Sequence, residues 1–160
     1  MRISNEILSI KEAGKKDVDF LFNLRNKKYV YKYSRNARPI KYKEHINWAN
    51  PIINNERKNI LLYVVLYCKR KAGQIRFDLL RKSKAEVNIS FLRKYHGKGI
   101  AVPAMKKSIE TIKDKGLEKI IAIILPENLG SIKFFEKCGF KDTKKLTKEN
   151  AKIYELNLRL

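Results

Sequence analysis

Residues 94–101 read KYHGKGIA, and they follow directly on AEVNISFL (85–92), in which apolar and polar residues alternate. The alternation predicts a strand, and the apolar spacing after Ile100 predicts a helix that ends at Gly116. Backbone amides between such a strand and helix point toward one spot beside the positive end of the helix dipole. Glycine lets the backbone approach an anion because no Cβ stands in the way. The stretch therefore predicts an anion-binding loop whose shape suits a pyrophosphate.

The rest of the chain supplies further strands and helices around this loop. Alternating or β-branched apolar runs predict strands at 7–13, 59–69, 72–80, 117–125 and 151–160. Helical spacing of apolar residues predicts helices at 17–27, 42–54 and 129–140. No repeat or Gly/Ser linker divides the chain, so we expect residues 1–160 to form a single domain. The order of elements predicts an α/β fold of three layers, with a mixed central sheet and helices on both faces.

The composition argues against several classes of protein. No apolar run approaches the roughly 18 residues that a membrane span needs, and the N-terminal segment lacks the apolar core of a signal peptide. Cys68 and Cys138 have no CxxC or histidine partner nearby in the sequence. We therefore expect neither a disulfide framework nor a metal site, and a cytoplasmic location.

The net charge of +21 is of the kind that indicates binding to nucleic acid or to a membrane surface. Lysine outnumbers arginine 27 to 10, however, and the basic residues form no block or tail. Because arginine is the better fork for phosphates and base edges, a lysine excess is weak evidence for specific readout of nucleic acid. An anionic small molecule would be attracted by the same positive electrostatic field. We expect such a partner, keep nucleic acid as the less favoured alternative, and leave the oligomeric state open between monomer and homodimer.

Two common nucleotide-binding motifs are absent. The pattern GxxxxGK[ST] does not occur, and Val102 stands where a dinucleotide fingerprint has its third glycine. Instead, HGKGIA after AEVNISF, with ILPENLGSIKFFEKCGF (124–140) further on, closely resembles the GNAT superfamily of N-acetyltransferases. The family writes its loop R/Q-x-x-G-x-G/A, and His96, Gly99 and Ala101 fall on those positions. The resemblance covers nearly the whole order of elements and implies acetyl-CoA as cosubstrate.

The resemblance also implies a cofactor site. In this family the loop amides bind the pyrophosphate of coenzyme A, and the pantetheine inserts where the preceding strand splays from the next one. The residues implied here are Phe91, Leu92, His96, Gly97, Lys98, Gly99, Ile100, Ala101, Asn128 and Ser131. His96 replaces the usual Arg or Gln, and Phe135 replaces a tyrosine thought to protonate the leaving thiolate in many relatives. The usual general acid is therefore missing from its position.

Acetyl transfer to nitrogen requires a neutral amine. Because a free alkyl amine has a pKa near ~10, a general base helps, and a backbone amide around Phe91 or Leu92 would meet the developing oxyanion. Glu86, at the start of the motif strand, is the first candidate base, Asp78 on the neighbouring strand is the second, and His45 is the third. A solvated or ion-paired carboxylate and a packed histidine are the alternative interpretations.

The N-terminal third usually sets acceptor choice in this superfamily. Its LRN, Ser-x-Asn and H-x-x-W segments resemble acetyltransferases that act on nucleotide-linked amino sugars. Trp48, one helical turn from His45, has a ring that could stack on a sugar or base, and arginines could meet a diphosphate through charge-assisted pairs. The acceptor-binding residues expected are Arg25, Asn26, Trp48 and Arg76, with Arg35 and Arg38 as further candidates. Core packing of Trp48 and simple solvation of the arginines remain alternatives.

The sequence thus predicts an acetyl-CoA-dependent N-acetyltransferase acting on a primary amine, with a nucleotide-linked amino sugar as the favoured acceptor. One alternative is an acetyltransferase of protein N-termini or ribosomal proteins. The other is a nucleic-acid-binding module that uses the same fold without catalysis.

Overall fold

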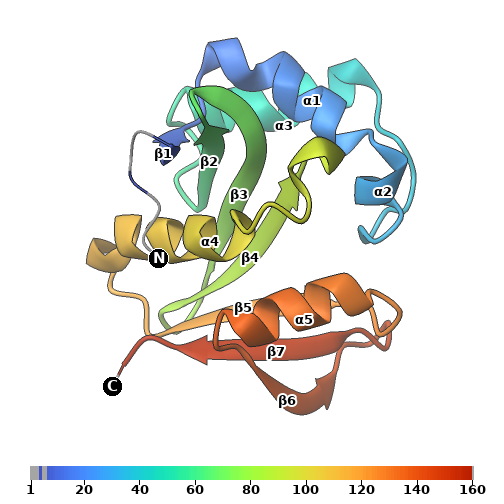
Figure 1. The fold of residues 1–160 in the computed structure, drawn as a ribbon, viewed down its shortest axis with the longest axis vertical. Helices are drawn as coiled ribbons and strands as arrows, with labels where there is room; N and C mark the ends of the chain where they lie inside the picture. The colour runs from blue at the N-terminus through green and yellow to red at the C-terminus, as the bar shows by residue number, and fades with distance from the viewer. Residues whose placement is uncertain (1–3, 5–6, 160) are drawn as a thin grey trace.

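The computed structural model of the chain describes residue 4 and residues 7–159. Within these residues one sheet of seven strands has the order β1-β2-β3-β4-β5-β7-β6 (Figure 1). The strands are β1 (Leu8–Glu12), β2 (Ile60–Tyr67), β3 (Arg70–Leu80), β4 (Lys84–Phe91), β5 (Lys119–Ile124), β6 (Lys141–Leu146) and β7 (Lys152–Asn157). Only β4 and β5 pair in parallel, and every other pair is antiparallel. The predicted mixed sheet is confirmed.

Helices cover both faces of this sheet. They are α1 (Val18–Arg25), α2 (Lys28–Tyr31), α3 (Tyr42–Ile53), α4 (Ala101–Thr111) and α5 (Leu129–Lys137). On one face, Leu21 of α1 and Trp48 of α3 pack with Leu62 and Val64 of β2. On the other, α4 and α5 pack over the larger apolar cluster, which includes buried residues of β3, β4 and β5 (Figure 1). The three-layer arrangement is confirmed.

Two short elements were not predicted. The strand β6 reads KDTKKL, with Leu146 as its one apolar residue, so no alternation marks it. It forms beside β7 with pairs such as Asp142↔Tyr154, so tertiary pairing and not local pattern creates it. The other element is the four-residue helix α2, which contains no buried residue. Pro51 lies inside α3, and the helix ends two residues beyond it at Ile53.

The strands β4 and β5 run together for only a short distance. Their parallel pairing consists of Lys84↔Lys119, Ala85↔Ile120 and Glu86↔Ile121, and beyond these pairs the strands diverge (Figure 1). The divergence opens toward the end of β4, where the chain passes through residues 92–100 into α4. We call the space between the diverging strands the gap. The splay that the family resemblance implied is present.

The start of α1 is fixed to the sheet by a buried carboxylate. Asp17 is fully buried, and its oxygens lie 2.5 Å from Lys11 Nζ and 2.8 Å from Lys71 Nζ. The backbone amide of Gly14 also donates to it, at 2.8 Å. Burial acts to raise the pKa of Asp17, but the bonds from Lys11, Lys71 and Gly14 outweigh it, so the pKa lies below its usual value. Because Lys11 is on β1 and Lys71 on β3, Asp17 joins three elements.

No helix in the described part of the chain is long and apolar enough to cross a membrane.

Candidate functional site

The backbone of β4 presents amides to the gap. Leu92 donates its amide hydrogen to the Ala72 carbonyl at 2.9 Å, so this amide belongs to the β3–β4 ladder. In an antiparallel pair, bonding alternates along the strand, and the amides of Ile89 and Phe91 therefore face away from β3, toward the gap. The prediction of Leu92 as an oxyanion donor is wrong because its hydrogen is already used. Phe91 remains a candidate, and Ile89 joins it.

The loop after β4 is built from glycines with left-handed backbone angles. Gly97 has a φ of +75° and Gly99 a φ of +71°, and a Cβ added at either would meet nothing within 4 Å. His96 and Gly97 form a hydrogen-bonded turn, and after it the backbone amides of residues 99–102 have no backbone hydrogen-bond acceptor within the described residues. They lie at the start of α4, where the helix dipole is positive. Ile100 is 2% exposed and so contributes only backbone, whereas Lys98 is exposed. These residues fit a diphosphate group, because donors converge where no side chain intervenes.

The His96 side chain contacts the end of β4. Its Nε2 lies 3.0 Å from the Phe91 carbonyl oxygen, and its ring meets Tyr29 edge-on with centroids 5.7 Å apart. The Tyr29 hydroxyl accepts a hydrogen bond from the amide of Arg93 at 2.9 Å, and the Arg93 guanidinium lies 4.5 Å from the Tyr29 ring centroid. Tyr29 thereby joins α2 to the loop. No local sequence pattern indicates this contact, because 64 residues separate the two partners.

Asn128 and Ser131 fix the start of α5. The Asn128 side-chain oxygen accepts a hydrogen bond from the Ser131 amide at 3.3 Å, which is an N-cap contact. Phe135, further along the same helix, is 5% exposed, and its ring centroid lies 4.9 Å from that of Phe134 and 5.0 Å from that of Phe140. The position that carries a tyrosine in many relatives is therefore occupied here by an apolar core side chain.

A row of polar side chains lies on the face of β3 and β4 that is opposite the larger apolar cluster. The register places Asp78 opposite Glu86, Arg76 opposite Asn88, and Gln74 opposite Ser90. Arg76 Nε lies 2.9 Å from Asp78 Oδ1, and Gln74 Nε2 donates to Asn88 at 2.8 Å and to Ser90 at 3.0 Å. We call these six residues the polar face. Gln74, Asn88 and Ser90 were not predicted, although the alternation in AEVNISF contained the signal for Asn88 and Ser90, since Val87 and Phe91 on either side of them are buried.

The candidate base Glu86 is paired with an arginine from the N-terminal third. Arg35 Nη2 lies 2.6 Å from Glu86 Oε1, and the exposed fractions are 73% for the arginine side chain and 17% for the carboxylate. Asp78, the second candidate base, is engaged by Arg76. Both carboxylates are thus ion-paired, and Glu86 is the one whose partner is mostly in solvent.

Arg35 belongs to a segment whose two ends are held together. We call residues 27–39 the strap. Asn26 donates to the Ile40 carbonyl at 2.9 Å and accepts from the Ile40 amide at 2.8 Å. Arg25 donates to the carbonyls of Asn36 and Arg38 at 3.2 and 3.3 Å. The structure therefore uses Arg25 and Asn26, predicted to bind the acceptor, to close the base of the strap.

The pKa of Arg25 indicates that other cations lie near it. Burial lowers the pKa of its guanidinium, and the nearby cations Arg38 and Arg76 lower the pKa further. The strap and the polar face thus bring arginines from α1, the strap and β3 close together.

His45 and Trp48 are packing residues. His45 is 2% exposed, its Nε2 lies 2.9 Å from the Val18 carbonyl oxygen, and burial lowers its pKa. Its buried ring joins α3 to α1 and is closed to an incoming amine, so His45 does not serve as the base. Trp48 is partly buried in the α1–α3 cluster, and the Arg76 guanidinium lies 5.7 Å from its ring centroid. Trp48 therefore acts on the site through Arg76.

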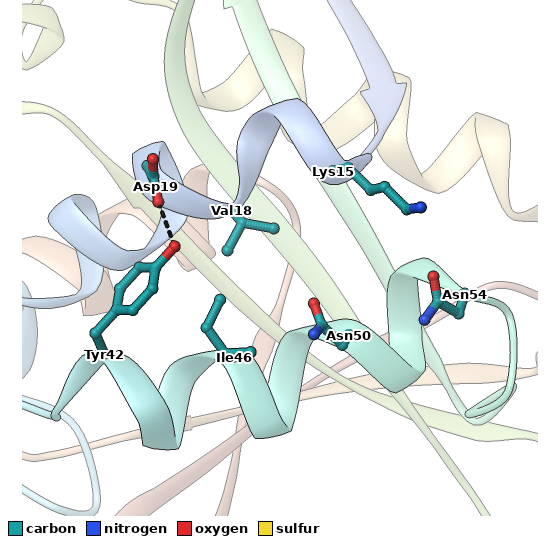
Figure 2. A pocket seen from close by; sticks show the side chains of 7 residues that line it. All are labelled: Lys15, Val18, Asp19, Tyr42, Ile46, Asn50 and Asn54. Carbon is teal, nitrogen blue, oxygen red and sulfur yellow. Dashed lines mark hydrogen bonds between the residues drawn. The ribbon is translucent and has the colours of Figure 1, made fainter.

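A pocket of about 400 Å³ lies between α1 and α3 (Figure 2). Figure 2 shows Tyr42 donating to Asp19, at 2.7 Å, with Ile46, Asn50 and Asn54 further along α3. None of the residues of the loop, the gap or the polar face lines it. The predicted cofactor and acceptor residues thus lie elsewhere, along open strand edges and loops.

Residues 8–141 match the model of the acetyltransferase (GNAT) domain. The chain belongs to this family. It is 31% identical over 155 residues to an uncharacterized protein of Methanocaldococcus jannaschii, a match that covers 93% of this chain and 31% of that protein. The chain therefore spans about a third of the length of this curated relative.

Solved structures show the same fold. A domain from Methanocaldococcus jannaschii has a TM-score of 0.83 at 30% identity, over 94% of this chain and 98% of that one. Spermidine N-acetyltransferase from Vibrio cholerae, in complex with CoA and spermine, has a TM-score of 0.80 at 20% identity, over 94% of each chain. An aminoglycoside acetyltransferase in complex with coenzyme A has a TM-score of 0.81 at 13% identity, over 95% of each chain. At such identities the last two show the fold alone.

Proposed function

We propose that this GNAT domain transfers the acetyl group of acetyl-CoA to a primary amine on an anionic small molecule, with a nucleotide-linked amino sugar as the acceptor class. The observation that carries the proposal is the divergence of β4 from β5 after Glu86↔Ile121, which leads into unbonded amides at the start of α4. An elongated cofactor whose thioester-bearing arm leads to a diphosphate fits this arrangement.

The cofactor side of the site acts through the backbone. Acetyl-CoA, when bound, supplies an activated acetyl thioester. The amides of residues 99–102 would hold its diphosphate. The amides of Ile89 and Phe91 face the gap and are available to a developing negative charge on oxygen.

The acceptor side supplies the base. An alkyl ammonium must lose a proton before its nitrogen can attack, and a carboxylate within hydrogen-bond reach can accept that proton. Glu86 lies at the last β4–β5 pair, where the polar face meets the gap. We assign it the role of general base, with Asp78 holding Arg76.

The charge of this side favours an anionic acceptor. Its carboxylates Glu86, Asp78 and Glu44 each lie within ion-pair distance of an arginine, Arg35, Arg76 and Arg38 respectively. Arg25 adds a fourth cation against three carboxylates, and it donates to the neutral backbone carbonyls of Arg38 and Asn36. A polycation such as spermine would find no unpaired acid among these groups, whereas a phosphate would find guanidinium forks.

A coenzyme A release assay tests the proposal. It compares UDP-linked amino sugars with spermidine, N-terminal peptides and simple alkyl amines at equal concentration. We expect the fastest release with a UDP-amino sugar. Preference for peptides would favour the protein-acetylating alternative. Release with none of them, together with salt-sensitive RNA binding, would favour a non-catalytic nucleic-acid-binding module.

A further inference from the structure

Two arginines of the acceptor side are held very differently. Arg76 has its Nε within ion-pair distance of Asp78 Oδ1, at 2.9 Å, and its guanidinium over Trp48, and its side chain is 29% exposed. Arg35 has a side chain that is 73% exposed, and within the described residues its one hydrogen-bond partner is Glu86. Arg76 is therefore a fixed cation, whereas Arg35 can leave its partner without disturbing a packed group.

Arg35 covers the carboxylate that the reaction needs. Glu86 is 17% exposed in this pairing, and its Oε1 is engaged by the guanidinium at 2.6 Å. An incoming ammonium would have to share that carboxylate with a cation already in place, and like charges at one site disfavour each other. The base can work on an amine only after Arg35 has moved.

The strap allows Arg35 to move alone. Its ends are tied through Asn26 to Ile40 and through Arg25 to Asn36 and Arg38, and Tyr29 ties it to Arg93. A long, mostly solvated side chain can change rotamer while these backbone ties stay in place. Exposed ion pairs contribute little to stability, so exchange of one anionic partner for another is easy. A diphosphate offers the guanidinium fork the same planar, charge-assisted contacts as a carboxylate does.

We propose that Arg35 is a specificity-determining residue that covers Glu86 until the anion of the acceptor draws it away. This inference rests on the proposed function, because it takes Glu86 as the base and a nucleoside diphosphate as the anion. An anionic acceptor then uncovers its own base, with Arg76 as the fixed anchor and Arg35 as the movable one. A neutral or cationic amine leaves Glu86 covered.

The first experiment measures binding and needs no acetyl transfer. UDP is titrated by calorimetry into the wild type, Arg35→Gln, Glu86→Gln and the double variant, with Arg70→Gln as the control. Arg70 is an exposed arginine at the opposite end of β3. We expect Arg35→Gln to weaken UDP binding roughly tenfold, the scale of a lost charge-assisted contact, and Arg70→Gln to change it little. Glu86→Gln should tighten binding, because Arg35 no longer has a competing partner.

The double variant separates exchange from a general charge effect. If Arg35 exchanges partners, Glu86→Gln tightens UDP binding much less when Arg35 is already glutamine. Equal tightening in both backgrounds would overturn the proposal. So would a wild type that does not bind UDP, or an Arg35→Gln variant that binds it like Arg70→Gln.

A second measurement keeps this inference distinct from the proposed activity. With a UDP-amino sugar and a simple alkyl amine that carries no anionic group as acceptors, Arg35→Gln should lower the ratio of the two kcat/KM values. An unchanged ratio would overturn the specificity role. If no amine is acetylated while the coupling in UDP binding is present, the activity is refuted and the exchange of Arg35 between two anions stands.

Discussion

The two halves of the candidate site use different groups of the chain, since one half uses the backbone and the other uses side chains. The cofactor half, from the end of β4 into α4, offers backbone amides made accessible by Gly97 and Gly99. The acceptor half offers side chains, which are Glu86, Asp78 and Arg76 on the sheet and Arg35 on the strap. A backbone site depends on conformation and tolerates most side-chain changes, whereas a side-chain site changes its preference with single substitutions. The comparison indicates that the fold determines which cofactor is bound, whereas a few ion pairs between side chains determine which acceptor is preferred.

The largest effect we expect comes from breaking the backbone half. Gly99→Val should abolish the thermal stabilisation by acetyl-CoA, because its Cβ and methyl groups would fill the open space before the amides. Gly116→Val is the matched control, since Gly116 has a φ of +69° and also has open space around it. Both variants lose stability through the same backbone strain, but only Gly99→Val should lose the cofactor. Normal coenzyme A binding by Gly99→Val would show that the loop assignment is wrong.

The next effect tests the side-chain half alone. Glu86→Gln should lower turnover by about 10²-fold, the lower end of the range for a general base, and should weaken the rise of turnover with pH. Coenzyme A affinity, measured by calorimetry, should stay at the wild-type value, because the cofactor half does not use this carboxylate. Wild-type rates between about pH 6 and pH 9 would rule out a side-chain base on β4, and leave alignment of an already neutral amine as the source of catalysis.

A third change loosens the support of the acceptor half. Asp17→Asn should cost about 1–3 kcal/mol of unfolding free energy, because Lys11 and Lys71 lose their buried partner. These lysine side chains are 42% and 33% exposed, so both can return to water, which limits the cost. Chemical denaturation measures it, with Asp114→Asn, on an exposed turn, as the control.

The same carboxylate gives a pH dependence with a definite sign. Since the folded pKa of Asp17 lies below its usual value, its contribution is fully present above the unfolded pKa of about 3.9 and is lost as the pH falls through the folded pKa. The unfolding free energy of the wild type should therefore fall more steeply below about pH 4 than that of Asp17→Asn. Equal slopes would show that Asp17 has no such role.

The smallest effect concerns the base of the strap. Asn26→Ala removes the two hydrogen bonds to Ile40, each worth about 0.5–1.5 kcal/mol, and so loosens the segment that carries Arg35. We expect KM for the acceptor to rise several-fold while coenzyme A affinity stays constant, with Asn54→Ala, exposed at the end of α3, as the control. A matching loss of coenzyme A affinity would mean that the two halves are not separable.

The sequence predicted the backbone half better than the side-chain half for a physical reason. Glycine spacing after an alternating strand is local, so the loop and the start of α4 could be placed from HGKGIA and its surroundings, and the family resemblance implied the gap. The Arg35–Glu86 pair joins residues 51 positions apart, and no local pattern contains it. Arg25 and Asn26 were expected to bind the acceptor and His45 to act as a base, but their polar atoms bond to backbone carbonyls or amides that only the folded chain brings near.

The alternation of residues in a strand also does not indicate which neighbouring strand each backbone amide faces. Alternation in AEVNISFL shows which side chains share a face, but not which amides bond to β3. Only the register shows that Leu92 is bonded to Ala72 while Phe91 faces the gap. The strand β6 was missed because KDTKKL has no apolar alternation and depends on β7 for its formation.

The divergence of β4 and β5 has a consequence for the behaviour of the protein in a crowded solution. Beyond Glu86↔Ile121, two strand edges within one domain lack a partner strand on the sides that face each other. The β4 edge presents the backbone amides of Ile89 and Phe91, and unpaired strand edges recruit strands from other chains. A molecule seated between these edges would also shield them. We therefore expect coenzyme A to reduce the light scattering of concentrated, warmed samples by more than its effect on the melting temperature explains, which would make the cofactor a determinant of solubility as well as a reactant.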